Sequence, residues 1–379
     1  MRTLSALSLL LIAASFTHAQ SPASPPVPLN EAHWELTGTA AAFTDYKGAH
    51  TLRLTDGGAD QTGDNIVTLK DVTFANGTIE YDIALTDETR FTSIHFRRKD
   101  GADTEHLYLR ANAVGDTSVN SAIQYAAVID GVNLWDLSGD YQSNAHLLGD
   151  EWNHVKLVVR DRQLLAYVND MERPALYVPR MDGDWERGSV GFDGTAYITN
   201  VVVQPGETPG LAPGAGYDLT DNDPRYLRIW RVSTPIGMPF GSEPTDAQVP
   251  DEQADWSTIR AERLGLINLS RRFGATPRGE RRLVWLATTI TAEEAQRRSL
   301  NLGFSDEVYV SLNGRPLYVD KNLYNTPGMK TPGGRLSVEN TSIDLPLRAG
   351  ENELLIGVTN FFFGWGLVAR LDDGRGLRY

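Results

Sequence analysis

The sequence predicts an all-β protein made of two tandem β-sandwich (jelly-roll) domains. Two blocks of short apolar or alternating segments, 33–203 and 226–371, show almost no helical periodicity. A stretch rich in proline and glycine, 204–216, joins them. A chain of 379 residues is long enough for two domains that each bury a core, so we expect each block to fold as one sandwich.

The ends of the blocks give the expected domain boundaries. Arg2, the apolar run 4–16 and the small-residue end Thr17-His-Ala19 are typical of a secretory signal peptide. Cysteine is absent, so no disulfide can form, and export without disulfides predicts a periplasmic or secreted protein of a bacterium. The expected segments are a signal peptide at 1–19, a proline-rich leader at 20–29, a first sandwich at 30–205, a linker at 206–221 and a second sandwich at 222–379.

The formal net charge of −14 argues against two classes of partner. Proteins that bind nucleic acids or anionic membranes concentrate Lys and Arg on one face, and here the acidic excess is spread along the chain. After the signal, no segment reaches the roughly 18 to 20 apolar residues that a membrane helix needs. We therefore expect no nucleic-acid partner and no membrane insertion, and the sequence leaves the oligomeric state open.

The first block is read as a series of strands. The segment 152–170 predicts a hairpin, because Val155, Leu157 and Val159 share one face and the polar residues 160–163 form a turn before 164–168. Earlier in the block, period-two alternation or short apolar runs predict further strands at 51–54, 65–69, 77–85, 93–97, 106–110 and 121–128.

The second block begins with the strand pattern 226–232. In the segment 306–318, Asn313-Gly314 predicts a tight primed turn between two strands. Thr291-Ala-Glu-Glu294 has capping-box spacing and predicts a helical turn. Trp365 follows three phenylalanines, and we expect it to fill the core, although its flanking glycines leave a ligand contact open.

The first block resembles concanavalin A-like and laminin-G-like jelly rolls. The resemblance rests on the hairpin 152–170, on Asn76-Gly-Thr-Ile-Glu-Tyr-Asp82 and on the closing segments 188–192 and 196–201. It implies a superfamily of lectins, adhesion modules, glycosidases and 3-keto-disaccharide hydrolases. The second block resembles the galactose-binding-like jelly rolls of β-galactosidase-type enzymes, on Asn313-Gly314, Ala349-Gly-Glu-Asn352 and 364–370.

Polar and aromatic residues at alternate positions of neighbouring strands, and therefore on one face of the sheet, suggest a ligand site in the first block. If these strands are adjacent, the face turned away from the core forms a concave surface, where guanidinium groups and rings can bind sugar hydroxyls. A solvated polar sheet face is the alternative. The candidate ligand-binding residues are His95, Arg97, Tyr108, Arg110, Gln124 and Trp135.

An enzymatic alternative starts from Glu80 and Asp82, which share one strand face as in the Glu-x-Asp-x-x-Glu signature of laminarinase-type glucanases. The signature is incomplete, because Leu85 and Ala84 occupy the two positions where its general acid would stand. Retaining glycoside hydrolysis needs both carboxyl groups about 5 to 5.5 Å apart. We therefore expect no catalytic residue and keep this pair as the alternative.

Other chemistries lack their sequence signatures. No histidine has a recognised zinc spacing, and neither a phosphate-binding loop nor a Gly-x-Ser-x-Gly turn occurs. Asp218, Asp221 and Asp223 offer oxygen ligands for a structural calcium ion, although an aspartate-rich turn explains them as well. We expect no cofactor beyond this possible calcium.

These observations predict an exported protein that binds a glycan or oligosaccharide on the first sandwich and has no catalysis of its own. One alternative is a hydrolase of glycosides or 3-keto sugars that uses carboxylates of the first sandwich. A second is a protein-binding adhesion module.

Overall fold

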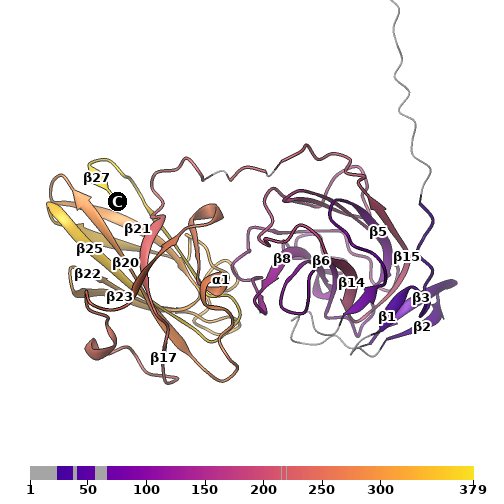
Figure 1. The fold of residues 1–379 in the computed structure, drawn as a ribbon, viewed down its shortest axis with the longest axis horizontal. Coiled ribbons are helices and arrows are strands. Elements are labelled where there is room, and N and C mark those ends of the chain that lie inside the picture. The colour runs from indigo at the N-terminus through magenta and orange to yellow at the C-terminus, as the bar shows by residue number, and fades with distance from the viewer. Residues whose placement is uncertain (1–23, 37–40, 56–65, 215, 219) are drawn as a thin grey trace, which may run out of the picture.

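A computed structural model describes residues 24–36, 41–55, 66–214, 216–218 and 220–379. The predicted signal peptide and the start of the leader lie outside the described residues. Regular structure in these described residues is almost entirely β, and their strands form four sheets (Figure 1), so the predicted fold class is confirmed. Among the residues that the structure describes, no helix is long and apolar enough to cross a membrane.

Residues 34–205 supply two antiparallel sheets. Sheet 1 contains, in spatial order, β1 (Trp34–Leu36), β4 (Val67–Leu69), β14 (Ser189–Gly194), β6 (Phe91–Arg98), β7 (Thr104–Arg110), β8 (Ile123–Ile129) and β10 (Gln142–Ser143), with β9 (Val132–Asn133) paired to β8. Sheet 2 contains β13 (Leu176–Val178), β12 (Gln163–Val168), β11 (Trp152–Arg160), β5 (Gly77–Ala84), β15 (Ala196–Pro205), β3 (Ala49–Leu54) and β2 (Ala41–Tyr46).

Alternation along these strands builds the first core. Ile94 and Phe96 on sheet 1 and Tyr81, Ile83 and Leu157 on sheet 2 belong to one buried cluster. Residues of the opposite parity on sheet 1 point away from that cluster. The predicted hairpin is confirmed as β11 paired with β12, with Arg160 opposite Gln163 at the turn.

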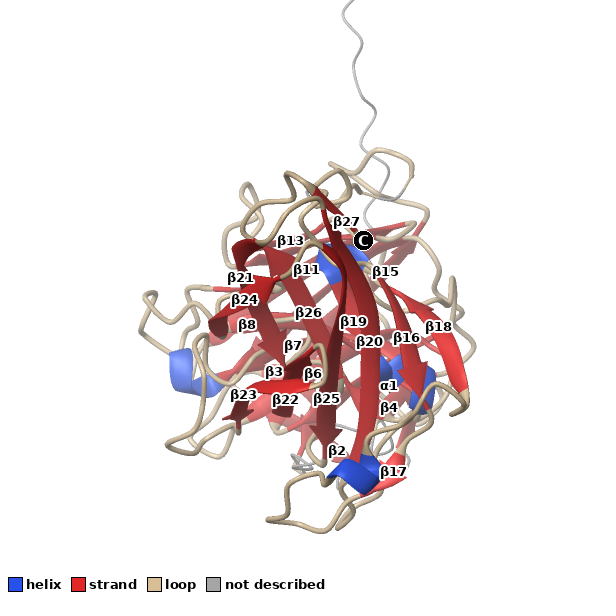
Figure 2. Cartoon of the chain, turned by 90° about the vertical axis from the view of Figure 1, so that its left-hand side faces the viewer, coloured by secondary structure: helices blue, strands red, loops and turns tan. Residues whose placement is uncertain are grey.

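Residues 229–378 supply the other two sheets (Figure 2). Sheet 3 contains β18 (Trp256–Arg260), β16 (Ile229–Ser233), β20 (Arg282–Ala292), β25 (Gly350–Asn360), β22 (Asp306–Leu312) and β23 (Arg315–Asn322), with β17 (Ile236–Gly237) and β27 (Leu377–Arg378) paired to β20. Sheet 4 contains β19 (Leu266–Asn268), β26 (Gly366–Leu371), β21 (Gln296–Phe304) and β24 (Thr341–Leu347). The short helical elements are α1 (Leu269–Phe273), η1 (Ala111–Ala113), η2 (Asp246–Gln248) and η3 (Arg263–Gly265).

The second core confirms two sequence-based expectations and corrects a third. Trp365 is fully buried in it, as expected. Asn313 and Gly314 both have positive φ, as a primed turn requires. The predicted helical turn at 291–294 is wrong, because β20 continues to Ala292 in register with β25 and β27. Pairing along the whole ladder outweighs the local capping signal.

The segment between the two pairs of sheets is packed along the first pair. Leu211 is buried against Val158 and Leu165. The Gln163 side-chain amide donates to the carbonyl oxygens of Ala212 and Gly214 at 2.9 and 2.7 Å. Residues 211–214 of this connection therefore pack against the first pair of sheets.

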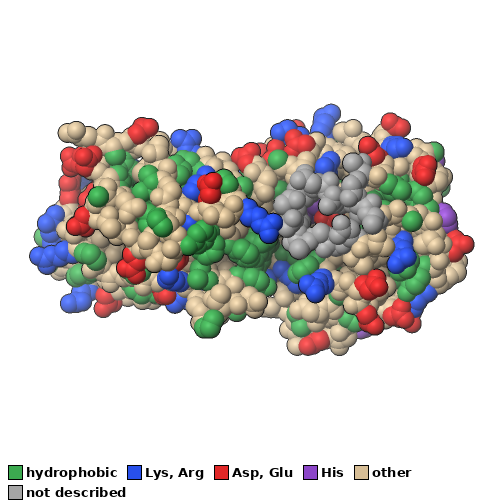
Figure 3. All heavy atoms as spheres, turned by 90° about the horizontal axis from the view of Figure 1, so that it is seen from below, with side chains coloured by type: hydrophobic (Ala, Val, Ile, Leu, Met, Phe, Trp, Pro, Cys, Tyr) green, Lys and Arg blue, Asp and Glu red, His purple; other side chains and the backbone are tan. Residues whose placement is uncertain are grey.

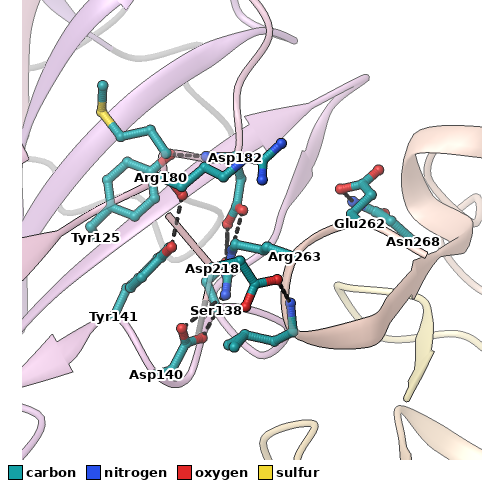
Figure 4. Close-up of polar contacts among 12 residues, drawn as sticks. Tyr125, Ser138, Asp140, Tyr141, Arg180, Asp182, Asp218, Glu262, Arg263 and Asn268 are labelled. Carbon is teal, nitrogen blue, oxygen red and sulfur yellow. Dashed lines mark hydrogen bonds and ion pairs between the residues drawn. The ribbon is translucent and has the colours of Figure 1, made fainter. Parts of the chain in front are cut away.

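A buried ionic cluster joins the two halves (Figure 4). Arg263, from η3 of the second half, binds Asp182 of the first half through Nε–Oδ1 and Nη2–Oδ2 contacts of 2.5 and 3.0 Å. Its Nη1 lies 2.8 Å from Asp140 Oδ2, and Ser138 Oγ donates to Asp182 at 2.6 Å. Burial opposes ionisation of Asp182, but the charge of Arg263 together with the hydrogen bonds from Arg263 and Ser138 lowers the pKa of this carboxyl group.

Candidate functional site

Three predicted site residues form one hydrogen-bonded network on the outer face of sheet 1. Tyr108 on β7 lies opposite Gln124 on β8, and the Tyr108 hydroxyl donates to Gln124 Oε1 at 2.7 Å. Arg110 Nη2 donates to the same oxygen at 2.6 Å and to the Tyr108 hydroxyl at 2.9 Å. The Gln124 amide donates onward to the carbonyl oxygen of Trp135 at 2.6 Å. Strand alternation and register therefore bring three of the predicted residues together, and Trp135, which follows β9, joins them through its backbone.

His95 lies further along the same face and is fully buried. Its Nε2 is 3.2 Å from Asp193 Oδ2, and its ring packs edge-to-face on that of His106. Burial, and then the charge of His95, lowers the pKa of His106 to about 3, so His106 is neutral at physiological pH. His95 is therefore joined to the Tyr108 network through the His106 ring, beside the network rather than within it.

Arg97 is separate from the other predicted residues. It has a positive φ of 50°, and the register between β14 and β6 shifts next to it, as in a β-bulge. Its Nε and Nη2 donate to the Ala75 carbonyl oxygen at 2.7 Å and to Asn76 Oδ1 at 2.8 Å. The bulge redirects this side chain to a cavity at the end of the sandwich, which Trp185 and Glu186 also line.

A small aromatic cavity lies over the Tyr108–Arg110 network, between the two halves of the molecule. We call it the slot; its volume is about 190 Å³. Hydrophobic side chains also gather on the surface where the halves meet (Figure 3). The slot is lined by Phe91, Tyr108, Arg110 and Trp135 from the first half and by Tyr324, Phe362 and Phe363 from the second.

The rings of the slot hold one another at fixed angles. Tyr324 meets Trp135 edge-on with centroids 4.9 Å apart, and it lies nearly parallel to Phe362 at 6.1 Å. Phe363 meets Trp135 edge-on at 5.8 Å. Ring pairs of this geometry are stabilising beyond their buried area. The second half thus supplies one wall of the slot and the first half supplies the floor.

Two buried carboxyl groups position the loop 361–364 that carries this wall. Asp306 Oδ2 accepts the backbone N–H groups of Phe361 and Phe362 at 2.6 and 3.1 Å. Asp136, from the first half, accepts the N–H of Gly364 at 3.1 Å. A Cβ atom at Gly364 would stand 2.4 Å from Asp136 Oδ1, so this approach requires glycine. Burial raises the pKa of Asp136 to about 7.

The slot opens toward a larger groove of about 770 Å³, which shares Phe91, Arg110 and Tyr324 with it. This groove is more polar and runs beside the turn 86–90, the η1 segment and Asp150. A ligand in the slot therefore has room to extend along one side of the first half. Cavities of several hundred Å³ with an apolar lining and a few placed polar groups are typical ligand sites.

The alternative catalytic pair, Glu80 and Asp82, lies on sheet 2, away from the slot. His154 bridges the two carboxylates, with Nδ1 at 2.6 Å from Asp82 Oδ1 and Nε2 at 3.3 Å from Glu80 Oε2. Asp82 Oδ2 also accepts from Asn200 at 2.7 Å. Neither carboxylate lines the slot or the groove.

The three aspartates considered for calcium do not converge. Asp218 accepts from Thr220 and from the Leu264 N–H, Asp223 pairs with Arg225, and Asp221 lies 4.0 Å from Arg180. Within the described parts of the chain, no three acidic or histidine side chains are grouped so that they could hold a metal. Asp218 caps the turn at the junction (Figure 4).

Comparisons with known proteins give only distant structural similarity. No family model matches the chain, and no curated protein matches it either. The similar solved structures include a carbohydrate-binding module, CBM66, from Bacillus subtilis, with 17% identity and a TM-score of 0.35 over 45% of this chain and 95% of that one. They also include chicken galectin 2, with 13% identity and a TM-score of 0.26 over 35% and 95%, and a Bacillus licheniformis β-glucanase, with 12% and 0.31 over 49% and 99%. Values this low carry no argument about ligand or activity.

Sequence reasoning missed the wall of the slot. Tyr324, Phe362 and Phe363 are more than 180 residues away from Trp135 in the chain, and no local periodicity connects them. The only sequence pattern that pointed to this wall was the run of three phenylalanines before Gly364. Such a run is unusually apolar for the end of a strand.

Proposed function

We propose that the chain is an exported carbohydrate-binding protein that holds a sugar ring in the slot between its two halves and does not cleave it. In this proposal the first half is a concanavalin A/laminin-G-like module at 30–205. The second is a galactose-binding-like module at 222–379, reached through a linker at 206–221. Residues 1–19 act as the signal for export to a bacterial periplasm or exterior.

The observation that carries the proposal is the combination of ring faces with a fixed guanidinium. A sugar ring has apolar C–H faces and a rim of hydroxyl groups. Trp135, Tyr324 and Phe362 offer flat apolar surface, and Arg110 offers N–H donors at the same cavity. Because the Arg110 side chain is already held by Tyr108 and Gln124, little conformational entropy is lost when a ligand binds.

The absence of catalysis in the proposal rests on the placement of the carboxylates. Asp136 and Asp306 near the slot are engaged by backbone N–H groups of the loop 361–364. Glu80 and Asp82 share His154 on the other sheet. A pair of free carboxyl groups facing one ligand, as glycoside hydrolysis needs, is not present among the residues that line the slot.

A glycan array with matched variants tests the function. Tyr324→Ala removes a slot ring that is 47% exposed, and Tyr177→Ala removes an equally exposed ring on β13 as the control. We expect the wild type and Tyr177→Ala to retain the same glycans, and we expect Tyr324→Ala to bind them at least about tenfold more weakly, since an aromatic anchor contributes about 1.5 kcal/mol or more. Arg110→Ala should abolish retention. Failure of the wild-type protein to retain any glycan would remove the proposal.

The two alternatives give different results in the same assays. Hydrolysis would appear as release of reducing sugar that Glu80→Gln and Asp82→Asn diminish, and release unchanged by both would remove that pair. An adhesion module would retain a protein partner with the slot variants as active as the wild type.

A further inference from the structure

Arg110 carries a buried positive charge whose hydrogen-bond partners are all neutral. Its guanidinium donates to the Ser121 carbonyl oxygen at 2.6 Å, to Gln124 Oε1 at 2.6 Å and to the Tyr108 hydroxyl at 2.9 Å. A guanidinium has five N–H donors, so two have no bond to the described part of the protein. The residue is only 8% exposed and lines both the slot and the groove, so a ligand there lies beside this charge.

A second buried guanidinium lies behind Trp135. Arg335 is also 8% exposed, and its charged group lies over the Trp135 ring, 5.2 Å from the centroid. Its Nη1 donates to the Gly333 carbonyl oxygen, and its buried Nε has no partner among the residues that are described. Burial, and then the charge of Arg110, lowers the pKa of Arg335, so the two cations are close enough to repel each other.

Charges inside proteins are normally matched by an opposite charge, because an unpaired buried ion loses its hydration without compensation. Here the aromatic faces supply part of the compensation, through cation–π contacts of Arg110 with Tyr108 and of Arg335 with Trp135. Asp136 acts on Arg335 electrostatically, but burial raises the pKa of this carboxyl group to about 7, so it is only partly ionised at neutral pH. The slot is therefore a place of local positive charge in a protein whose net charge is −14.

We propose that the slot takes an acidic sugar ring, such as a uronic acid or a sulfated sugar, with its anionic group at Arg110; this inference rests on the proposed carbohydrate-binding function. In this proposal, only the sugar ring that occupies the slot carries an acidic group. Asp87, Asp150 and Arg90 line the adjoining groove, and Asp150 is paired with Lys47, so the groove offers no excess of positive charge to a second acidic ring. The preferred ligand is a short chain with one acidic ring at its end.

Calorimetric titration with three synthetic tetrasaccharides of the same linkage tests the inference. The first is neutral galactose throughout, the second carries galacturonic acid only at the non-reducing end, and the third carries galacturonic acid at every position. A sulfated terminal galactose forms a fourth arm, which separates carboxylate from sulfate. We expect the singly acidic chains to bind at least about tenfold more tightly than the neutral chain, since a charge-assisted hydrogen bond contributes about 1.5–3 kcal/mol. The chain with four charges should bind no more tightly than the chain with one.

Variants connect the preference to the two arginines. Arg335 does not itself line the slot but lies over Trp135, so we expect Arg335→Gln to weaken the acidic chains more than the neutral chain. Arg110→Lys keeps the charge and should keep part of the preference, whereas Arg110→Gln should abolish it; thermal unfolding of each variant checks that it folds. Equal affinity for neutral and acidic chains would overturn the inference and leave the proposed function standing. Binding of neither, together with an empty glycan array, would overturn both.

Discussion

Asp136 in the first half of the chain accepts a hydrogen bond from the backbone amide of Gly364 in the second half, at 3.1 Å. Gly364 closes the loop whose two preceding residues, Phe362 and Phe363, form a wall of the slot. The geometry of the slot is therefore set by a contact between segments that lie 228 residues apart in the sequence.

Removing the carboxyl group of Asp136 should loosen this loop. Asp136→Ala leaves the buried Gly364 N–H unpaired, which costs about 1–3 kcal/mol. Asp136→Asn keeps an acceptor oxygen and should restore most of the wild-type behaviour. Hydrogen exchange measured on a peptide that covers 360–366 is expected to be faster in Asp136→Ala than in the wild type and nearly normal in Asp136→Asn. Identical exchange in all three proteins would show that Asp136 does not position the loop.

The same residue should make the stability of the protein depend on pH. Burial raises the pKa of Asp136 from 3.8 to about 7, although Arg335 and the N–H of Gly364 act in the opposite direction; Asp306 on β22 lies close to it. The folded state holds the proton more strongly than the unfolded state, so the free energy of unfolding falls as pH rises from about 4 to about 7. Asp136→Asn cannot ionise. Urea unfolding at pH 5, 6, 7 and 8 should show the wild type losing stability relative to this variant, and parallel curves would contradict the prediction.

His154 on sheet 2 should also make the stability of the protein depend on pH, through a raised histidine pKa. The hydrogen bond to Asp82 is the main cause that raises the pKa of His154, against an opposing effect of burial. A raised histidine pKa stabilises the folded state at pH values below its unfolded value of about 6.5, and this contribution is lost as pH rises through the folded value. Thermal unfolding should show His154→Gln less stable than the wild type at pH 5.5, with the gap closing by pH 9. A gap of the same size at both pH values would mean that the bridge acts through packing alone.

The ionic cluster at the junction should be essential for stability. Arg263→Ala would leave Asp182 and Asp140 without their cation, and breaking a buried ion pair in this way costs about 3–5 kcal/mol. Arg173→Ala is the matched control, because its ion pair with Asp170 is exposed and contributes at most about 1 kcal/mol. Chemical unfolding that gave both variants the same loss would contradict the role of Arg263.

The sequence was sufficient for the fold class and for the local geometry of the site floor. Period-two alternation places Tyr108 and Arg110 on one face of β7, and the register of β8 then brings Gln124 beside them. Arg97 departs from this pattern because of a bulge, which depends on the pairing partner β14 and has no clear signal in β6 itself.

The slot itself lies beyond sequence reasoning because it forms only when the two halves meet. The Trp135 ring contacts the rings of Tyr324 and Phe363. The sequence around these two residues has no pattern that predicts such a contact. The predicted helical turn at 291–294 failed for a similar reason, since long-range pairing of β20 with β25 outweighs a capping-box pattern. Strand faces follow from local alternation, whereas sites between modules depend on tertiary contacts.

A crystal structure of the protein with a glycan selected on the array tests the central claim most directly. We predict electron density for a sugar ring in the slot, against Tyr324 and within hydrogen-bond distance of Arg110, with any further rings running into the groove beside Asn112. Density for the glycan beside Glu80 and His154, or at the Arg97 cavity with the slot empty, would contradict the account.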